Sequence, residues 1–337
     1  MSRQAPLRRA TSYDVARLAG VSQSAVSRCF SPGGSIAPST REKIVKAANE
    51  LGYRPNALAQ GLISGRTNLV AVLISSLTNL YYPELLAELS RRLNDRDTRV
   101  LLFALHSESE VDAMLDQVWR HSVDGVISAA RLSDAQLQLF ADHRIPVVLY
   151  NRVGSTAASV CCDSASGERE LVQRLLAAGH KRFGIIAGPA DSYVGEERRR
   201  AAIDTLAEAG IVEPPVVRGD YSYTSGGAGL GELLALDPAL DAVICASDQM
   251  AIGAIDKARI ELGRAIPDDL SIVGFDGSGP ASWLSYDVSS IRQPVRRMAE
   301  AAVAMLCDLI EDADVPVERR LFAGQFVAGS SARLGKI

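Results

Sequence analysis

Four polar side chains near the N-terminus have the types and the spacing that base recognition requires. Gln23, Ser24, Ser27 and Arg28 stand at positions i, i+1, i+4 and i+5 of one short stretch. On a helix these positions share one face. Amide, hydroxyl and guanidinium groups on such a face can hydrogen-bond to base edges in the major groove of DNA. An ordinary helical hairpin with a polar outer face is the alternative that these residues leave open.

Two short helices must position that face. Thr11 can cap the first helix, with Asp14 three residues further on as its capping-box partner. Gly20 ends this helix, because glycine enters the left-handed conformation at low cost. Ser22 can then cap a second helix over residues 23–30. Two helices joined by a short turn that contains glycine form a helix-turn-helix pattern.

A third helix is predicted over residues 39–51, ended by Gly52. Its start has two solutions: Pro38 can occupy the first helical position, or Ser39 can cap the helix with Glu42 as its partner. The three helices predict a headpiece of about fifty residues, which is close to the lower limit for independent folding. The side chains predicted inside it are Leu18, Val21, Val26, Ile36, Ile44, Ala48 and Leu51.

Charge is distributed unevenly along the chain. Residues 1–66 hold ten Lys and Arg against three acidic residues, a net charge of +7. The whole chain carries −4, so the remaining residues carry −11. A basic segment that coincides with a helix-turn-helix pattern and precedes an acidic body is typical of DNA-binding proteins.

The segment between the head and the body reads as a short, weak helix followed by a linker. Pro55 ends the preceding helix, Asn56 can cap a new one, and Gly61 interrupts it. A helix of one or two turns does not hold in water alone. Two interpretations stay open, namely a helix ordered by DNA and a plain tether.

From residue 68 onward, strands alternate with amphipathic helices. Seven apolar runs read as buried strands: LVAVLI, RVLLFA, DGVIS, IPVVLY, FGIIAG, DAVICA and LSIVGF. The alternation predicts doubly wound parallel α/β sheets, and its length favours two lobes over one large sheet. Ligands bind such sheets at the carboxyl ends of the strands, so a site between the lobes is expected. The run GGAGLG at 226–231 indicates close packing or flexibility within a predicted helix.

Composition and motifs exclude several other classes of protein. No run of about 18 apolar residues and no signal peptide occurs, so a cytoplasmic protein without membrane contact is expected. Five cysteines with no CxxC pair predict buried reduced thiols. The four histidines lack metal-ligand spacing, and no motif for nucleotide binding, serine hydrolysis or zinc proteolysis occurs. We therefore expect no metal, no cofactor and no enzymatic activity.

Ordered motifs extend through nearly the whole chain. In the first sixty residues they are YDVARLAGVSQSAVSR and STREKIVKAANELGYRPNALAQGL. In the body they are TNLYYPELL, VDGVI, AAGHKRFGIIAGP, ASDQMAIGA, IPDDLSIVGFD and SIRQP. In this order they resemble the lactose-repressor (LacI/GalR) family of bacterial transcription regulators.

The resemblance implies a three-part organisation. Residues 1–55 are expected to form an all-α, three-helix helix-turn-helix headpiece, and residues 56–66 a hinge helix with its linker. Residues 67–337 are expected to form an effector-binding core with the two-lobed fold of periplasmic binding proteins, whose chain crosses between the lobes three times. The implied N-lobe covers about 67–153 and 291–319, and the C-lobe about 154–290 and 320–337.

The same resemblance assigns DNA contacts residue by residue. Residues that match family contacts, mostly to phosphates, are Tyr13, Ser22, Ser27, Arg28, Thr40, Tyr53 and Asn56. Gln23 and Ser24 match the two variable positions that set operator preference. In the hinge, Ala59 joins this set, and Leu62 matches a leucine that enters the minor groove. An apolar wedge of that kind can unstack a base step and kink the duplex.

The resemblance also assigns an effector site between the lobes. The matching positions are Tyr81, Asn151, Arg198, Tyr221, Ser247, Asp276 and Gln293. Arg and Asp can each bond two neighbouring hydroxyls, which suits a sugar or another polyol. Arg199 and Arg200 follow Arg198, so an acidic or phosphorylated effector stays open. Asp248 is expected to cap the helix over 249–262.

These features predict a DNA-binding transcription regulator, of the repressor type, whose operator affinity a small-molecule effector controls. The family implies a homodimer on a palindromic operator, associated with the nucleoid, and a carbohydrate as effector. The alternative is a soluble carbohydrate-binding protein without regulatory DNA binding. An enzyme built on an α/β fold is a further alternative, which the missing catalytic motifs disfavour.

Overall fold

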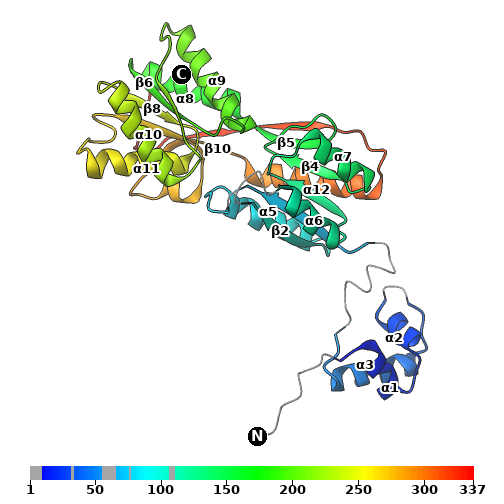
Figure 1. Ribbon diagram of the computed structural model, residues 1–337. Helices are drawn as coiled ribbons and strands as arrows, with labels where there is room; N and C mark the ends of the chain where they lie inside the picture. The colour runs from blue at the N-terminus through cyan, green and yellow to red at the C-terminus, as the bar shows by residue number, and fades with distance from the viewer. Residues whose placement is uncertain (1–9, 32–33, 55–65, 76, 106–110) are drawn as a thin grey trace. The chain divides into compact units, whose positions relative to one another are not determined.

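The computed structural model describes residues 10–31, 34–54, 66–75, 77–105 and 111–337. The chain divides into two compact units, residues 1–68 and residues 69–337. Figure 1 shows short helices in the first unit and two strand-containing lobes in the second. The hinge predicted over 56–66 lies outside the described residues, except for its last residue.

The first unit contains the predicted helix-turn-helix. Helices α1 (Ser12–Ala19) and α2 (Gln23–Phe30) meet at the turn around Gly20, which has a φ of +66°. Thr11 and Asp14 form the reciprocal capping box, and the Ser22 hydroxyl accepts a hydrogen bond from the backbone of α2. The local signals for caps and turn are therefore confirmed.

The first turn of helix α3 (Pro38–Glu50) shows which of its two predicted starts is correct. Pro38 occupies the first turn, and the capping position, Ala37, makes no side-chain hydrogen bond. The core of the unit is formed by Val15, Ala16, Val26, Cys29, Ile44, Ala47 and Ala48. Leu18 and Leu51 are 50% and 38% exposed, so their predicted place inside was wrong. Alanines at the helix contacts let the helices approach closely, which leaves little room for two more leucines.

The first lobe of the second unit is built on a parallel sheet in the order β11-β5-β4-β3-β1-β2. Its strands are β1 (Leu69–Ile74), β2 (Arg99–Ala104), β3 (Gly125–Ser128), β4 (Val147–Tyr150), β5 (Ala158–Asp163) and β11 (Arg319–Ala323). Its helices are α5 (Tyr82–Asn94), α6 (Val111–Arg120), α7 (Asp134–Asp142) and α12 (Val295–Glu311).

The second lobe repeats this plan in the order β12-β10-β9-β8-β6-β7, with only β12 antiparallel to its neighbour. Its strands are β6 (Phe183–Ala187), β7 (Val216–Arg218), β8 (Ala242–Cys245), β9 (Ser271–Asp276), β10 (Ser289–Arg292) and β12 (Gln325–Val327). Its helices are α8 (Ser164–Ala177), α9 (Tyr193–Glu208), α10 (Tyr223–Leu236) and α11 (Asp248–Asp256), which continues as a π-helical turn over Lys257–Glu261. Doubly wound parallel sheets are thus confirmed.

The chain passes between the lobes after β5, between β10 and α12, and between β11 and β12 (Figure 1). The lobe boundaries differ from those expected. Strand β5 belongs to the first sheet, so this lobe extends to about residue 163 and not to 153, and β11 keeps residues 319–323 in the same lobe. Both strands escaped prediction for a physical reason: β5 consists of small residues, and β11 is an edge strand that alternates with exposed Arg319 and Leu321.

The glycine run in α10 serves close packing against α11. A Cβ added at Gly226 would lie 2.0 Å from the carbonyl oxygen of Met250. A Cβ at Gly253 of α11 would lie 1.9 Å from the carbonyl oxygen of Tyr223. The two helix backbones therefore touch, which favours packing over flexibility as the role of this run.

Gly226→Ala should lower the free energy of unfolding by about 2–3 kcal/mol, because the new methyl group meets backbone that cannot move aside. Gly231→Ala in the same helix is the matched control, since its nearest neighbour would be the flexible end of Lys257 at 3.8 Å. There the substitution should stabilise by about 0.5–1 kcal/mol. Urea unfolding measures both, and equal effects would contradict the packing argument.

Candidate functional site

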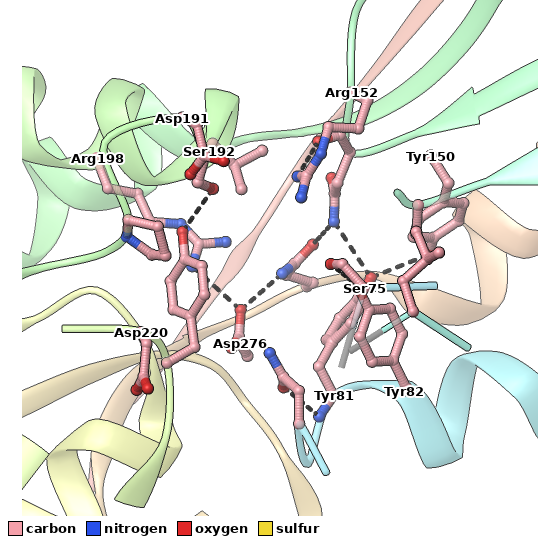
Figure 2. Close-up of a pocket in the computed structure, with 18 residues that line it drawn as sticks. Ser75, Tyr81, Tyr82, Tyr150, Arg152, Asp191, Ser192, Arg198, Asp220 and Asp276 are labelled. Carbon is pink, nitrogen blue, oxygen red and sulfur yellow. Dashed lines mark hydrogen bonds and ion pairs between the residues drawn. The ribbon is translucent and has the colours of Figure 1, made fainter. Parts of the chain in front are cut away.

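A cavity of about 270 Å³ lies between the lobes at the carboxyl ends of their strands. Figure 2 shows side chains from both lobes converging on it. Of the seven predicted effector residues, the structure brings six together on its wall: Tyr81, Asn151, Arg198, Tyr221, Asp276 and Gln293. The position of this cavity follows from the general rule for open α/β sheets.

A chain of hydrogen bonds connects the two lobes across the floor of the cavity. Gln293 donates to Asp276 Oδ1 at 2.7 Å, and Asn151 donates to Gln293 Oε1 at 2.9 Å. The Asn151 amide also reaches Tyr81 Oη at 3.5 Å, and Tyr81 shares a 3.0 Å hydrogen bond with Tyr150 Oη. Because the buried polar groups satisfy one another, the network is preorganised before any ligand arrives.

Arg198 is almost fully committed to the protein. It is 3% exposed, and its guanidinium donates to the Ala246 carbonyl at 2.6 Å and to Ser164 Oγ at 3.4 Å. The guanidinium also lies 3.2 Å from Asp276 Oδ1 and 3.7 Å above the centre of the Phe275 ring. Its charge is therefore balanced inside the protein.

Tyr221 forms the wall of the cavity on the second lobe. Its hydroxyl shares a 2.7 Å hydrogen bond with Ser192 Oγ, the capping group of α9. A Cβ at Gly195 would lie 2.3 Å from that hydroxyl, so only glycine allows the tyrosine to sit against the first turn of α9. Tyr221 is thereby fixed to the helix that carries Arg198.

Three of the site residues hold left-handed backbone conformations. The φ angles are +51° at Asn151, +68° at Tyr221 and +118° at Asp276. Such conformations cost about 1–3 kcal/mol each and persist where surrounding contacts enforce them. They aim each side chain into the cavity at the end of a strand or at the start of a helix.

The sequence motifs did not predict all residues of the cavity wall. Polar lining residues outside the predicted set include Ser75, Asn79, Tyr150, Arg152, Asp191 and Asp220. Ser75 comes directly after β1 and Arg152 two residues after β4, while Asp191 and Asp220 follow β6 and β7. Proximity to strand ends was thus a usable signal for them.

Ser247 does not belong to the cavity wall. It is 1% exposed, and its hydroxyl caps α11 by accepting a hydrogen bond from the backbone N–H of Met250. The expectation that Asp248 caps this helix was wrong, because the cap lies one residue earlier. The carboxylate of Asp248 instead accepts hydrogen bonds from Ser290 Oγ at 2.6 Å and from the backbone of Ser278 at 2.7 Å.

Two further carboxyl groups, those of Asp248 and Glu168, are buried in the second lobe. Burial and the nearby Asp276 raise the pKa of Asp248. Burial raises the pKa of Glu168 to about 8, against the opposing influence of Arg198. Glu168 is 1% exposed, and its Oε2 has no hydrogen-bond partner among the described residues. The core of the second lobe therefore favours a protonated Glu168 at neutral pH.

The predicted DNA-binding face lies on α1 and α2. Its outward side chains are Tyr13, Ser22, Gln23, Ser24 and Arg28, while Ser27 and Thr40 are half-buried. Tyr53 is also half-buried, with its ring centre 5.9 Å from that of Phe30. Asn56, Ala59 and Leu62 lie outside the described residues.

Replacing Glu168 with Gln should flatten the pH dependence of stability. The unfolded chain releases this proton near pH 4.3 and the folded protein near pH 8, so wild-type stability falls as the pH rises between them. From pH 5 to pH 7 the variant should gain about 2 kcal/mol relative to wild type, measured by urea unfolding. Glu170→Gln, in the same helix but bonded to Arg174, is the control. Parallel curves for Glu168→Gln and wild type would contradict the assignment.

Comparison with known proteins places both units. Residues 11–56 match the model of bacterial regulatory proteins of the lacI family, and residues 172–332 match the periplasmic binding protein-like domain. The HTH-type transcriptional regulator CelR of Thermobifida fusca is 33% identical over 315 residues, covering 90% of this chain and 92% of CelR. Catabolite control protein A of Priestia megaterium is 31% identical over 307 residues, covering 88% and 91%.

Solved structures agree with these matches. The lac repressor dimer bound to operator and the anti-inducer ONPF superposes with a TM-score of 0.83 at 27% identity, covering 96% of this chain and 99% of the repressor. The CelR–cellobiose complex has a TM-score of 0.73 at 30% identity, covering 96% and 100%. With its capped helix-turn-helix and its two-lobed α/β unit, the chain belongs to the lacI family of bacterial regulatory proteins.

Proposed function

We propose that a neutral carbohydrate, bound between the two lobes of this DNA-binding transcription regulator, controls its affinity for an operator. The observation that carries the proposal is the internal neutralisation of Arg198 by Asp276, 3.2 Å away. The remaining charged groups on the wall are Arg152, Asp191 and Asp220. With acids in excess, the cavity disfavours anions and offers acceptors to hydroxyl groups.

The run of three arginines does not supply an anion site. Arg199 is held by Glu196 on the same helix, and the exposed Arg200 is absent from the cavity wall. An acidic or phosphorylated effector is thereby disfavoured. The cellobiose bound by the related CelR supports a neutral sugar as the class of ligand.

Two copies of the chain are proposed to bind a palindromic operator, through Gln23 to Arg28 in the major groove. A homodimer is supported by the related lac repressor and by apolar residues on the second lobe. Trp283 is 60% exposed and Leu284 fully exposed, which favours coverage by a second subunit. We therefore propose a cytoplasmic, nucleoid-associated protein.

Repression, without any catalytic reaction, is the proposed mode of action, in line with relatives named as repressors. No helix among the described residues is long and apolar enough to cross a membrane.

A carbohydrate-binding protein without regulatory DNA binding is the alternative. The N-capped recognition helix, with Gln23, Ser24 and Arg28 exposed, favours the regulator.

DNA recognition is tested by titrating a duplex, selected from random DNA by the wild-type chain, at several salt concentrations. Affinity should fall linearly on a log–log plot, and Arg28→Ala should reduce the slope by about 1. Gln23→Ala should lower discrimination between selected and random DNA about tenfold or more. Arg200→Ala, outside the head, is the control. Salt-independent binding, or unchanged discrimination in Gln23→Ala, would contradict the proposal.

The effector class is tested by thermal shift with glucose, ribose, cellobiose and glucose 6-phosphate. A neutral sugar should raise the melting temperature, because a ligand of the folded state stabilises it. Asp220→Asn should weaken that binding about tenfold by removing a charged acceptor from the wall while the buried pair of Arg198 and Asp276 stays intact. Asp268→Asn, an exposed change outside the cavity, should leave the shift intact. Stabilisation by the phosphorylated sugar alone would contradict a neutral effector.

A further inference from the structure

Side chains of the two lobes meet directly at several points around the cavity. Gln249 of α11 accepts a 3.0 Å hydrogen bond from the backbone of Leu80 in the first lobe. Arg292 of β10 and Glu84 of α5 form an exposed ion pair at 3.5 Å. Apart from the hydrogen bonds across the floor of the cavity, a further meeting involves three side chains and joins α9 of the second lobe to β11 of the first.

This α9–β11 contact consists of Tyr193, Glu197 and Arg319. Arg319 donates to Tyr193 Oη at 2.8 Å, and Tyr193 donates to Glu197 Oε1 at 2.5 Å. The guanidinium also lies 4.0 Å from Glu197 and 5.5 Å from the centre of the tyrosine ring. The Tyr193 hydroxyl thus accepts a hydrogen bond from Arg319 of the first lobe and donates one to Glu197 of its own lobe. It makes both hydrogen bonds only when the two lobes lie as they do here.

The same two turns of α9 also carry effector-site residues. Ser192 caps the helix and holds Tyr221, while Val194 and Arg198 line the cavity. Tyr193 and Glu197 stand four residues apart on a neighbouring face and reach β11. A shift of α9 caused by a ligand in the cavity must therefore strain or break the α9–β11 contact, because one rigid helix carries both sets of residues.

The strand on the other side offers a fixed anchor. Arg319 begins β11, which pairs in parallel with β5 from Arg319 opposite Ser159 to Ala323 opposite Asp163. Both neighbouring crossovers, after β5 and after β11, leave the first lobe at the far end of these strands. The α9–β11 contact at Arg319 therefore lies at the opposite end of these strands from the two crossovers, so a rotation of the lobes about the crossovers would displace its two sides relative to one another.

We propose that Tyr193 and Arg319 are positioning residues: their contact holds the two lobes in the arrangement seen here and sets the balance between this arrangement and others. Effector occupancy shifts that balance through α9. The inference goes beyond the proposed function, on which only its statements about effector occupancy and DNA affinity rest.

The test is a double-mutant cycle in the full-length chain with Tyr193→Phe, Arg319→Met and the two combined. Amide hydrogen exchange, measured without DNA or sugar, should accelerate about threefold or more in α9 over residues 193–199 in each variant. The double variant should show less than the sum of the two single effects, because either change removes the same hydrogen bond from Arg319 to Tyr193 Oη. Affinity for the selected duplex should change in the same direction in all three variants.

Matched controls stay within the second lobe. Tyr223→Phe removes a similar hydrogen bond to Asp256, and Arg182→Met removes a similar pairing with Asp237. Neither should alter exchange in α9 or binding to the duplex. Additive effects of Tyr193→Phe and Arg319→Met, or exchange in α9 equal to wild type, would overturn the inference. If the wild-type chain does not bind the duplex, the proposed DNA-binding function is contradicted. The inference about the α9–β11 contact is then still decided by the hydrogen-exchange measurement.

Discussion

The buried pair of Arg198 and Asp276 is the interaction on which the effector site depends. Burying a charge is costly unless a partner and hydrogen bonds compensate it. Here Arg198 obtains its compensation from Asp276, from the Ala246 carbonyl and from the face of Phe275. Because β9 carries two of these groups and α9 carries the arginine, the pair also fixes that helix against its sheet. Removal of either member would leave the other buried without a counter-charge.

From this pair a continuous path of hydrogen bonds leads out of the second lobe. Gln293, in the crossing segment between β10 and α12, connects Asp276 to Asn151 at the end of β4. A ligand hydroxyl group that displaces a member of this path breaks a hydrogen bond that joins the lobes. Ligand binding thereby changes the relative stability of different arrangements of the two lobes. A ligand can control the protein only if it stabilises one such arrangement more than another.

Features set by local interactions could be predicted from the sequence, whereas those set by long-range packing could not. Thr11, Gly20 and Ser22 act within three or four residues, so both helices of the head were predictable. Strand β5 was missed because its small residues pack well only between two neighbouring strands. The roles of Ser247 and Asp248 were predicted wrongly because one residue of register decides which of them caps α11. The pairing of Arg319 with Tyr193 spans 126 residues and depends on the crossovers after β5 and between β10 and α12.

The two recognition surfaces follow opposite physical rules. On the head, caps and a core around Val26 fix the helices, while Gln23 and Ser24 project into solvent and contribute little to folding. In the effector site, buried groups such as Asp276 hold the fold and the ligand wall together. Changes in DNA preference can therefore accumulate at the surface with little loss of stability. A change of effector must instead preserve a satisfied network, since a buried polar group without a partner costs about 1–3 kcal/mol. The operator preference is accordingly the freer of the two specificities to diverge.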